Sequence, residues 1–75
     1  MTAIEVAFRY GNTPGTAELR ALDSVREVYG IRRIVFHEGE QVIRVEYDAS
    51  RLNENAVAAL LRNAGLDLRE KLALA

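Results

Sequence analysis

The two halves of the chain follow the same order of segments, and this order limits the fold more than any other feature. Each half begins with alternating apolar residues, continues with apolar residues at helical spacing, and reaches a glycine before the next apolar segment. Alternation at every second residue predicts a strand with one buried face, and spacing of three and four residues predicts an amphipathic helix. The sequence therefore predicts strand, helix, strand in each half.

The first half contains the clearest strand, whose apolar series is Ile4, Val6, Phe8 and Tyr10. A turn-rich loop from Gly11 to Thr16 follows, and it holds the only proline of the chain. Thr13 or Thr16 is expected to cap the helix, and Gly30 is expected to end it as the C′ residue. The apolar face of this helix is predicted to consist of Ala21, Leu22, Val25, Val28 and Tyr29.

A hairpin joins the two halves of the chain. Residues 31–36 and 42–47 are the expected strands, and Glu38-Gly39-Glu40 between them predicts a tight turn. Asn53 is a suitable N-cap for the second helix, and Gly65 is placed to close it. The apolar face of this helix is predicted to consist of Ala56, Val57, Leu60, Leu61 and Ala64.

The end of the chain allows two interpretations. Leu66, Leu68, Leu72 and Leu74 are compatible with a fourth strand and a tail, whereas Arg69-Glu70-Lys71 also suits a helix. With the strand, residues 1–75 form a single α+β domain of order βαββαβ. Two right-handed crossovers then give a ferredoxin-like two-layer sandwich, with a four-stranded antiparallel sheet and both helices on one face.

Composition narrows the functions that this domain can have. The chain has no cysteine, which excludes disulfides, thiolate nucleophiles and thiolate metal sites. Its net charge of −1 argues against a strong phosphate-driven affinity for nucleic acid. No apolar run approaches the ~18 residues of a membrane span, and the first ten residues do not resemble a signal peptide. We therefore expect a cytoplasmic protein that binds neither membrane nor nucleic acid.

The open face of the predicted sheet carries mixed charges around two valines. The residues expected there are Glu5, Arg9, Arg33, Val35, His37, Val42, Arg44 and Glu46. Phe36 and Tyr47 are predicted to point inward, so no aromatic side chain remains on this face for stacking on RNA bases. The face suits a protein contact or a homodimer, and a merely solvated surface is the alternative.

Four short segments recur at the spacing of a known family. Gly11 opens the loop, an ungapped count leads from it to Gly30-Ile31, Tyr47-Asp48 ends the third strand, and Ala64-Gly65-Leu66 ends the second helix. In this spacing the chain resembles the heavy-metal-associated (HMA) domains of copper chaperones and metal-transporting ATPases. That family carries a Gly-Met-x-Cys-x-x-Cys loop after its first strand. The resemblance covers Ile4 to Leu68.

The residues that bind metal in this family do not carry over. On the ungapped count the methionine falls on Asn12 and the two cysteines fall on Pro14 and Ala17. Soft Cu(I) requires sulfur ligands, and these three side chains offer none, so the resemblance implies a lost thiolate site. The resemblance also implies that Ala7 and Arg9 point inward, whereas the local alternation favours the opposite phase. A shifted loop or a bulge would reconcile the two.

Other candidate sites are weaker. His37 with Glu38, helped by Glu40 or Glu46, is the alternative metal site, although zinc requires about four fixed donors. The loop from Gly11 to Thr16, followed by a helix N-terminus, is the alternative site for a small anion. No hydroxyl has a histidine beside it in the expected fold, so we predict no enzyme activity and no cofactor; the hydroxyls considered are those of Thr13, Thr16, Ser24 and Ser50.

The function predicted from the sequence is that of a non-catalytic interaction or regulatory module. Its partner is expected to be another protein or a second copy, bound through the open sheet face or the first helix. Two alternatives remain open: a metal-binding or transport-related protein that uses His37 and carboxylates, and a sensor of a small anion or small molecule at the Gly11 loop.

Overall fold

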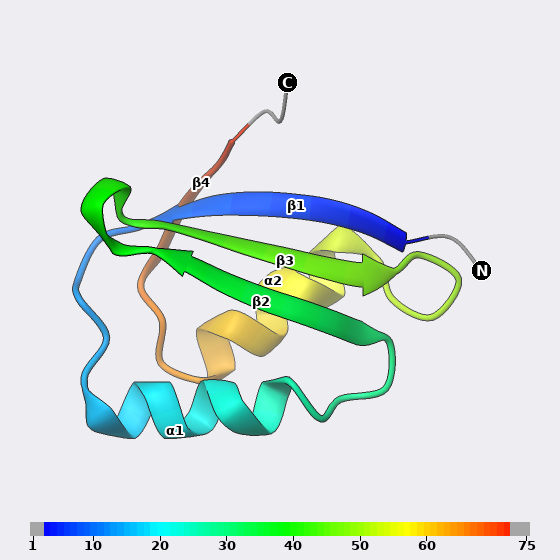
Figure 1. The fold of residues 1–75 in the computed structure, drawn as a ribbon, viewed down its shortest axis with the longest axis horizontal. Coiled ribbons are helices and arrows are strands. Elements are labelled where there is room, and N and C mark those ends of the chain that lie inside the picture. The colour runs from blue at the N-terminus through cyan, green and yellow to red at the C-terminus, as the bar shows by residue number, and fades with distance from the viewer. Residues whose placement is uncertain (1–2, 73–75) are drawn as a thin grey trace.

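Strands and helices follow each other in the expected βαββαβ order in the computed structural model, which describes residues 3–72 (Figure 1). The strands are β1 (Ala3–Tyr10), β2 (Ile31–His37), β3 (Val42–Asp48) and β4 (Leu68–Leu72). The helices are α1 (Thr16–Val25) and α2 (Glu54–Asn63), and a short 3-10 turn, η1 (Glu38–Glu40), links β2 to β3. The predicted α+β fold class is therefore confirmed.

The four strands form one antiparallel sheet in the order β2-β3-β1-β4, with both helices packed on one side of it (Figure 1). This order arises because α1 carries the chain past β3 to one edge, and α2 carries it past β1 to the other edge. The loop after β1, the η1 turn and the start of β4 consequently meet at the same end of the sheet, where the candidate site lies.

The local alternation of β1 determines which of its side chains enter the core. Val6, Phe8 and Tyr10 are each at most 4% exposed and belong to the hydrophobic core. The opposite phase implied by the HMA resemblance, with Ala7 and Arg9 inward, is therefore wrong. Ile4 of the same apolar series is 42% exposed, because β4 pairs with β1 only from Ala7 onward within the described residues.

The first helix is shorter than the sequence predicts. Regular helix ends at Val25, and a turn follows in which the amide of Val28 donates to the carbonyl of Val25 (3.0 Å). Gly30 has a positive φ of 103°, but it lies at the entrance of β2, so its assignment as the C′ residue of α1 is wrong. The turn allows the carbonyl of Gly30 to accept from the amide of Asp48 (2.7 Å), which aligns β2 with β3.

Tyr29 is placed on the apolar face of the first helix by its spacing, but its side chain is 73% exposed. Because α1 ends four residues earlier, helical periodicity does not turn this residue towards the sheet. The guanidinium of Arg51 lies 4.7 Å from the centre of the Tyr29 ring, in a cation–π contact. Leu22 and Val25 supply the buried side chains of α1.

Both ends of the second helix are as predicted. The side-chain oxygen of Asn53 accepts from the amide of Ala56 (2.8 Å), as an N-cap does. At the other end Gly65 has φ 99°, and the amide of Leu66 donates to the carbonyl of Leu61 (3.2 Å), as in a Schellman motif.

No helix within residues 3–72 is long and apolar enough to cross a membrane.

The ambiguous segment 69–75 is a strand as far as Leu72. The remaining three residues, which include Leu74 of the predicted strand, lie outside the described residues. The strand interpretation of Leu68 to Leu72 is therefore confirmed, and the helical one is wrong for these residues.

A bulge in β4 divides its leucines between the two faces of the sheet. Tyr10 pairs with Leu68, whereas Phe8 pairs with Lys71, so β4 carries one more residue than β1 in this stretch. The extra residue reverses the alternation. Leu68 packs against the core, and Leu72 lies on the open face.

The open face of the sheet carries the residues that the sequence assigns to it. The strand register places them in rows across β2, β3 and β1: Arg33, Glu46 and Glu5; Val35, Arg44 and Ala7; His37, Val42 and Arg9. Phe36 and Tyr47 belong to the opposite side and contact the core, as predicted. Among the described strands, no phenylalanine or tyrosine side chain lies on the open face.

Candidate functional site

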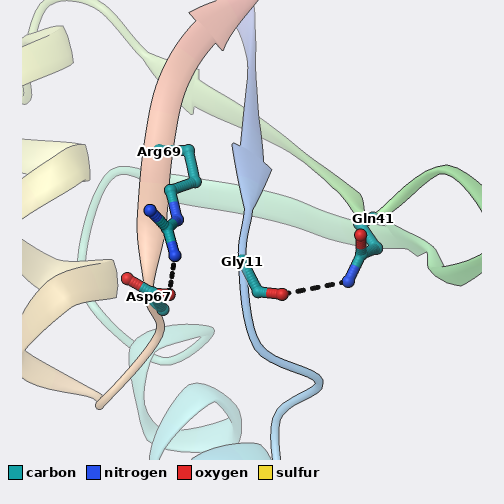
Figure 2. Close-up of polar contacts among 4 residues, drawn as sticks. All are labelled: Gly11, Gln41, Asp67 and Arg69. Carbon is teal, nitrogen blue, oxygen red and sulfur yellow. Dashed lines mark hydrogen bonds and ion pairs between the residues drawn. The ribbon is translucent and has the colours of Figure 1, made fainter.

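Three chain segments meet at one end of the fold, around the loop that follows β1. They are the loop 11–15, Gln41 after the η1 turn, and the segment from Asp67 to Arg69 at the start of β4. Figure 2 shows four of these residues, Gly11, Gln41, Asp67 and Arg69, which we call the loop-end cluster.

Gly11 is hydrogen-bonded on both sides of its backbone. Its amide donates to the carbonyl of Asp67 (2.9 Å), and its carbonyl accepts from the side-chain amide of Gln41 (3.0 Å; Figure 2). The loop therefore starts from a backbone position that is fixed by two segments distant in the sequence.

Gln41 is the only residue other than glycine with a positive φ among residues 3–72 (φ 54°, ψ 48°). The tight turn predicted at Glu38-Gly39-Glu40 is thus present as η1, but its left-handed residue is Gln41 and not Gly39. A side chain in this conformation costs about 1–2 kcal/mol. The bond to Gly11 and the bond from the amide of Tyr10 to the carbonyl of Gln41 (2.9 Å) offset that cost.

An ion pair between Asp67 and Arg69 lies against Gly11. A guanidinium nitrogen of Arg69 lies 3.0 Å from a carboxylate oxygen of Asp67. A Cβ atom at Gly11 would overlap both side chains, so glycine allows the pair to lie against the loop backbone. Because both side chains are more than a third exposed, the pair contributes little to stability. Sequence reasoning did not identify Gln41, Asp67 or Arg69, and no local motif marks them.

The three positions of the lost metal motif lie in and just after this loop. Asn12 and Ala17 are exposed and Pro14 is half-buried. Ala17 is already the second residue of α1, so its backbone is held in the helix. None of the three side chains carries sulfur or a charge, so they provide no soft-metal ligand.

Glu18 occupies the N-terminus of α1, where the alternative anion site is expected. The helix begins at Thr16 with Gly15 as its N-cap, so the assignment of Thr13 or Thr16 as the cap is wrong. The amide of Gly15 donates to the Glu18 carboxylate (2.8 Å), as in a capping box. The chain's own carboxylate thus uses a donor that an external anion would need. The small-anion sensor stays a prediction, and this contact argues against it.

His37 and Glu38, the alternative metal ligands, are both exposed at the end of β2. Within residues 3–72, no three His, Cys, Asp or Glu side chains gather closely enough to hold a metal ion. Burial raises the pKa of the Tyr10 hydroxyl, and the charge of Glu38 raises it further, so Tyr10 remains protonated at neutral pH. Metal binding through His37 stays a prediction without a described third ligand.

Leu19 is a large apolar side chain in the first turns of α1 that does not enter the core. It is 43% exposed, and its amide donates to the carbonyl of Gly15 (3.0 Å), which fixes its position relative to the loop. Its neighbours on the same side of the helix, Thr16 and Asp23, are exposed and polar. An exposed aliphatic side chain with two exposed polar neighbours therefore lies beside the loop.

Asp48, at the far end of β3, is the one buried acidic residue among those described, with 9% of its surface exposed. One of its carboxylate oxygens accepts from both the hydroxyl (2.7 Å) and the amide (3.0 Å) of Ser50. These two hydrogen bonds hold the pKa of Asp48 below its usual value. Asp48 therefore stabilises the turn after β3.

This lowered pKa predicts how stability depends on pH. A carboxyl whose pKa is lower in the folded state stabilises the fold above its unfolded pKa of 3.8, and this contribution disappears as pH falls towards the folded value. We expect Ser50→Ala to reduce the loss of stability between pH 5 and pH 2, because Asp48 loses one donor. Urea midpoints across this range measure the effect. Ser24→Ala, at an exposed serine of α1, is the control and should retain the wild-type profile.

Comparisons with protein-family models, with curated proteins and with solved structures give no significant match. What is shown is a ferredoxin-like βαββαβ domain without cysteine. The HMA resemblance stays an interpretation of the loop and glycine spacing.

Proposed function

We propose that this chain is a non-catalytic protein-interaction module that binds a partner protein through the loop after β1 and the exposed side of α1. Domains of the HMA family recognise their partners through the same two elements. The surfaces of these two elements can persist after the metal ligands are lost. The resemblance therefore suggests a role that survives the loss of the cysteines.

The hydrogen bonds around Gly11 are the observation on which this proposal depends. Gln41 and Asp67 hold the start of the loop, and Glu18 holds its end at Gly15. A surface that is ordered before binding loses less conformational entropy when a partner docks. Transfer of a metal between two proteins, in contrast, needs a mobile loop, and Pro14 further restricts the backbone here.

Leu19 supplies the apolar contact that such a surface needs. Interfaces often depend on a few apolar side chains surrounded by polar ones. Leu19 is an exposed apolar side chain with the polar neighbours Thr16 and Asp23 on its helix, beside the fixed loop. On the open sheet face, Ala7 and Val42 are only 1% and 9% exposed, so these two side chains offer little apolar area to a partner. The ion pairs of Arg44 with Glu5 (3.4 Å) and of Arg9 with Glu70 (3.7 Å) also lie on that face.

Affinity capture with three baits tests this proposal. The baits are the wild-type chain, Leu19→Glu, and Ala59→Glu, which places the same charge on the exposed side of α2. We expect a partner that is retained by the wild type and by Ala59→Glu, and weakened at least about tenfold by Leu19→Glu. Equal retention by all three baits, or no partner at all, would contradict the proposed surface.

A further inference from the structure

Strand β2 forms an outer edge of the sheet along its whole length (Figure 1). The sheet order places β3 on one side of it and no described strand on the other. From Arg33 to His37 it pairs with β3 without interruption, and the only register shift lies between Ile31 and Arg33. The second part of β2 is therefore a regular strand with an open edge.

The directions of the backbone groups in β2 follow from one hydrogen bond. The amide of Asp48 donates to the carbonyl of Gly30, so at Asp48 the backbone of β3 faces β2. Because these directions alternate along antiparallel strands, Val35 and the residues two positions away from it direct their amides and carbonyls towards β3. Ile34 and Phe36 therefore direct theirs outward, to the open edge.

Natural edge strands are usually protected against pairing with another chain. Charged side chains, prolines and bulges are the common devices. In β2 the register shift and the two arginines, Arg32 and Arg33, lie at its beginning. The segment from Ile34 to Phe36 has no charge, no proline and no bulge, so this part of the edge is open to another strand.

We propose that a second copy of this chain pairs with β2 along this edge, antiparallel and centred on Val35. Opposite residues in an antiparallel pair share one face, so Val35 meets Val35 of the second copy and Ile34 meets its Phe36. The two outward-facing residues of each copy then exchange four backbone hydrogen bonds across the two-fold axis. The result is one continuous eight-stranded sheet.

Other symmetric registers form fewer regular bonds. Pairing centred on Ile34 would oppose Phe36 to Arg32, which lies at the register shift. Pairing centred on Phe36 would oppose Ile34 to Glu38, which has left the strand for the η1 turn. Val35 is the midpoint of the regular segment, so only its register uses that segment in full.

The side chains of β2 are compatible with this pairing on both faces. On the helix side, Ile34 is 6% exposed and Phe36 packs against the core, so each would extend the core of the other copy. The Phe36 ring also contacts Tyr10 edge to face, with centroids 5.8 Å apart, which fixes its orientation. On the open face, Val35 meets Val35 and Arg33 lies opposite His37 of the second copy. No pair of acidic residues or of arginines is brought together.

The contact is small, because only five residues of each copy take part. Interfaces below the usual size are typical of weak and reversible association. We therefore expect a dimer that depends on concentration and is populated at about 1 mM chain. This surface does not include Leu19, so self-association and partner binding can fail independently of each other.

Disulfide trapping tests the register directly. The chain has no cysteine, so Val35→Cys introduces a single thiol. Opposite residues that do not share hydrogen bonds have Cα atoms about 4.5 Å apart, within the range that a disulfide spans. Glu46→Cys, on the same face but one strand further in, is the control. We expect Val35→Cys to be oxidised to a covalent dimer at least about tenfold faster. Equal rates would overturn the proposal.

Sedimentation of the unmodified chain gives a second test. The wild type and Val35→Thr should associate at about 1 mM, whereas Val35→Lys should remain monomeric because two ammonium groups would meet at the axis. Circular dichroism checks that the wild type and both variants are folded. In the dimer, the amides of Ile34 and Phe36 should exchange with solvent more slowly than in Val35→Lys. A monomeric wild type, or a dimer that Val35→Lys retains, would overturn the proposal.

Discussion

Replacing Leu61 with alanine is expected to lower the free energy of unfolding by about 2–5 kcal/mol. The Leu61 side chain, on α2, has no exposed surface and lies in the core with Leu22 of α1 and Ile43 of β3. Its loss removes buried methyl groups and leaves a cavity that a close-packed core refills only partly. A domain of 75 residues has a total stability of about 4–11 kcal/mol, so this single change removes a large share of it.

Urea unfolding measures this effect, and the midpoint should fall while the slope stays unchanged. Leu19→Ala is the matched control, because it makes the same chemical change at a side chain that is 43% exposed. Its effect should stay within about 0.5 kcal/mol. If Leu61→Ala costs less than about 1 kcal/mol, α2 does not pack on the sheet as described.

The core was predictable because bulky side chains alternate strictly where one face of a strand is buried. Val6 and Phe8 show this in β1, and Val45 and Tyr47 show it in β3. In each strand a shift by one residue would expose the apolar series to water, so the sequence allows only one phase. The cost of exposing these side chains to water determines the phase of β1, and the opposite phase implied by the family resemblance is not adopted.

The bulge in β4 was not predictable, because it depends on pairing between distant segments. It places Lys71 on the helix side of the sheet, where its ammonium group lies 2.8 Å from the Glu54 carboxylate of α2. This hydrogen bond and the charge of Glu54 raise the pKa of Lys71. In the sequence, Lys71 looks like an ordinary solvated residue. The unbroken alternation of leucines would place Leu72 in the core.

The contacts of the candidate site were not predictable for the same reason, because they also join segments that are distant in the sequence. The sequence indicates the loop through Gly11 and Pro14, since glycine and proline mark turns locally. It does not indicate what holds the loop, because Gln41 lies 30 positions from Gly11 and Asp67 lies further still. Gln41 donates a single side-chain hydrogen bond to Gly11, which many polar side chains could form, and Asp67 accepts through its backbone carbonyl, a group that every residue has. Local patterns therefore locate the loop and leave its rigidity undetermined.

Gly30→Ala is expected to lower the free energy of unfolding by about 2–3 kcal/mol. Gly30 has φ 103°, a conformation that L-amino acids rarely adopt. A Cβ atom there would also lie 3.0 Å from the Cβ of Arg51 and from side-chain carbons of Leu52, so the turn after β3 would have to move. The carbonyl of Gly30 accepts from Asp48, and strain in the turn therefore also reaches the pairing of β2 with β3. Thermal unfolding should show a loss of roughly 10–20 °C.

Two further glycines separate the backbone cost from the steric cost. Gly39→Ala makes the same change where φ is not positive and nothing lies near the added Cβ, so stability should stay within about 0.5 kcal/mol. Gly65→Ala has a similar φ of 99°, but its nearest neighbour is the flexible side chain of Glu18. Its cost should therefore lie between the other two. If Gly30→Ala were as stable as Gly39→Ala, the turn between α1 and β2 would have another conformation.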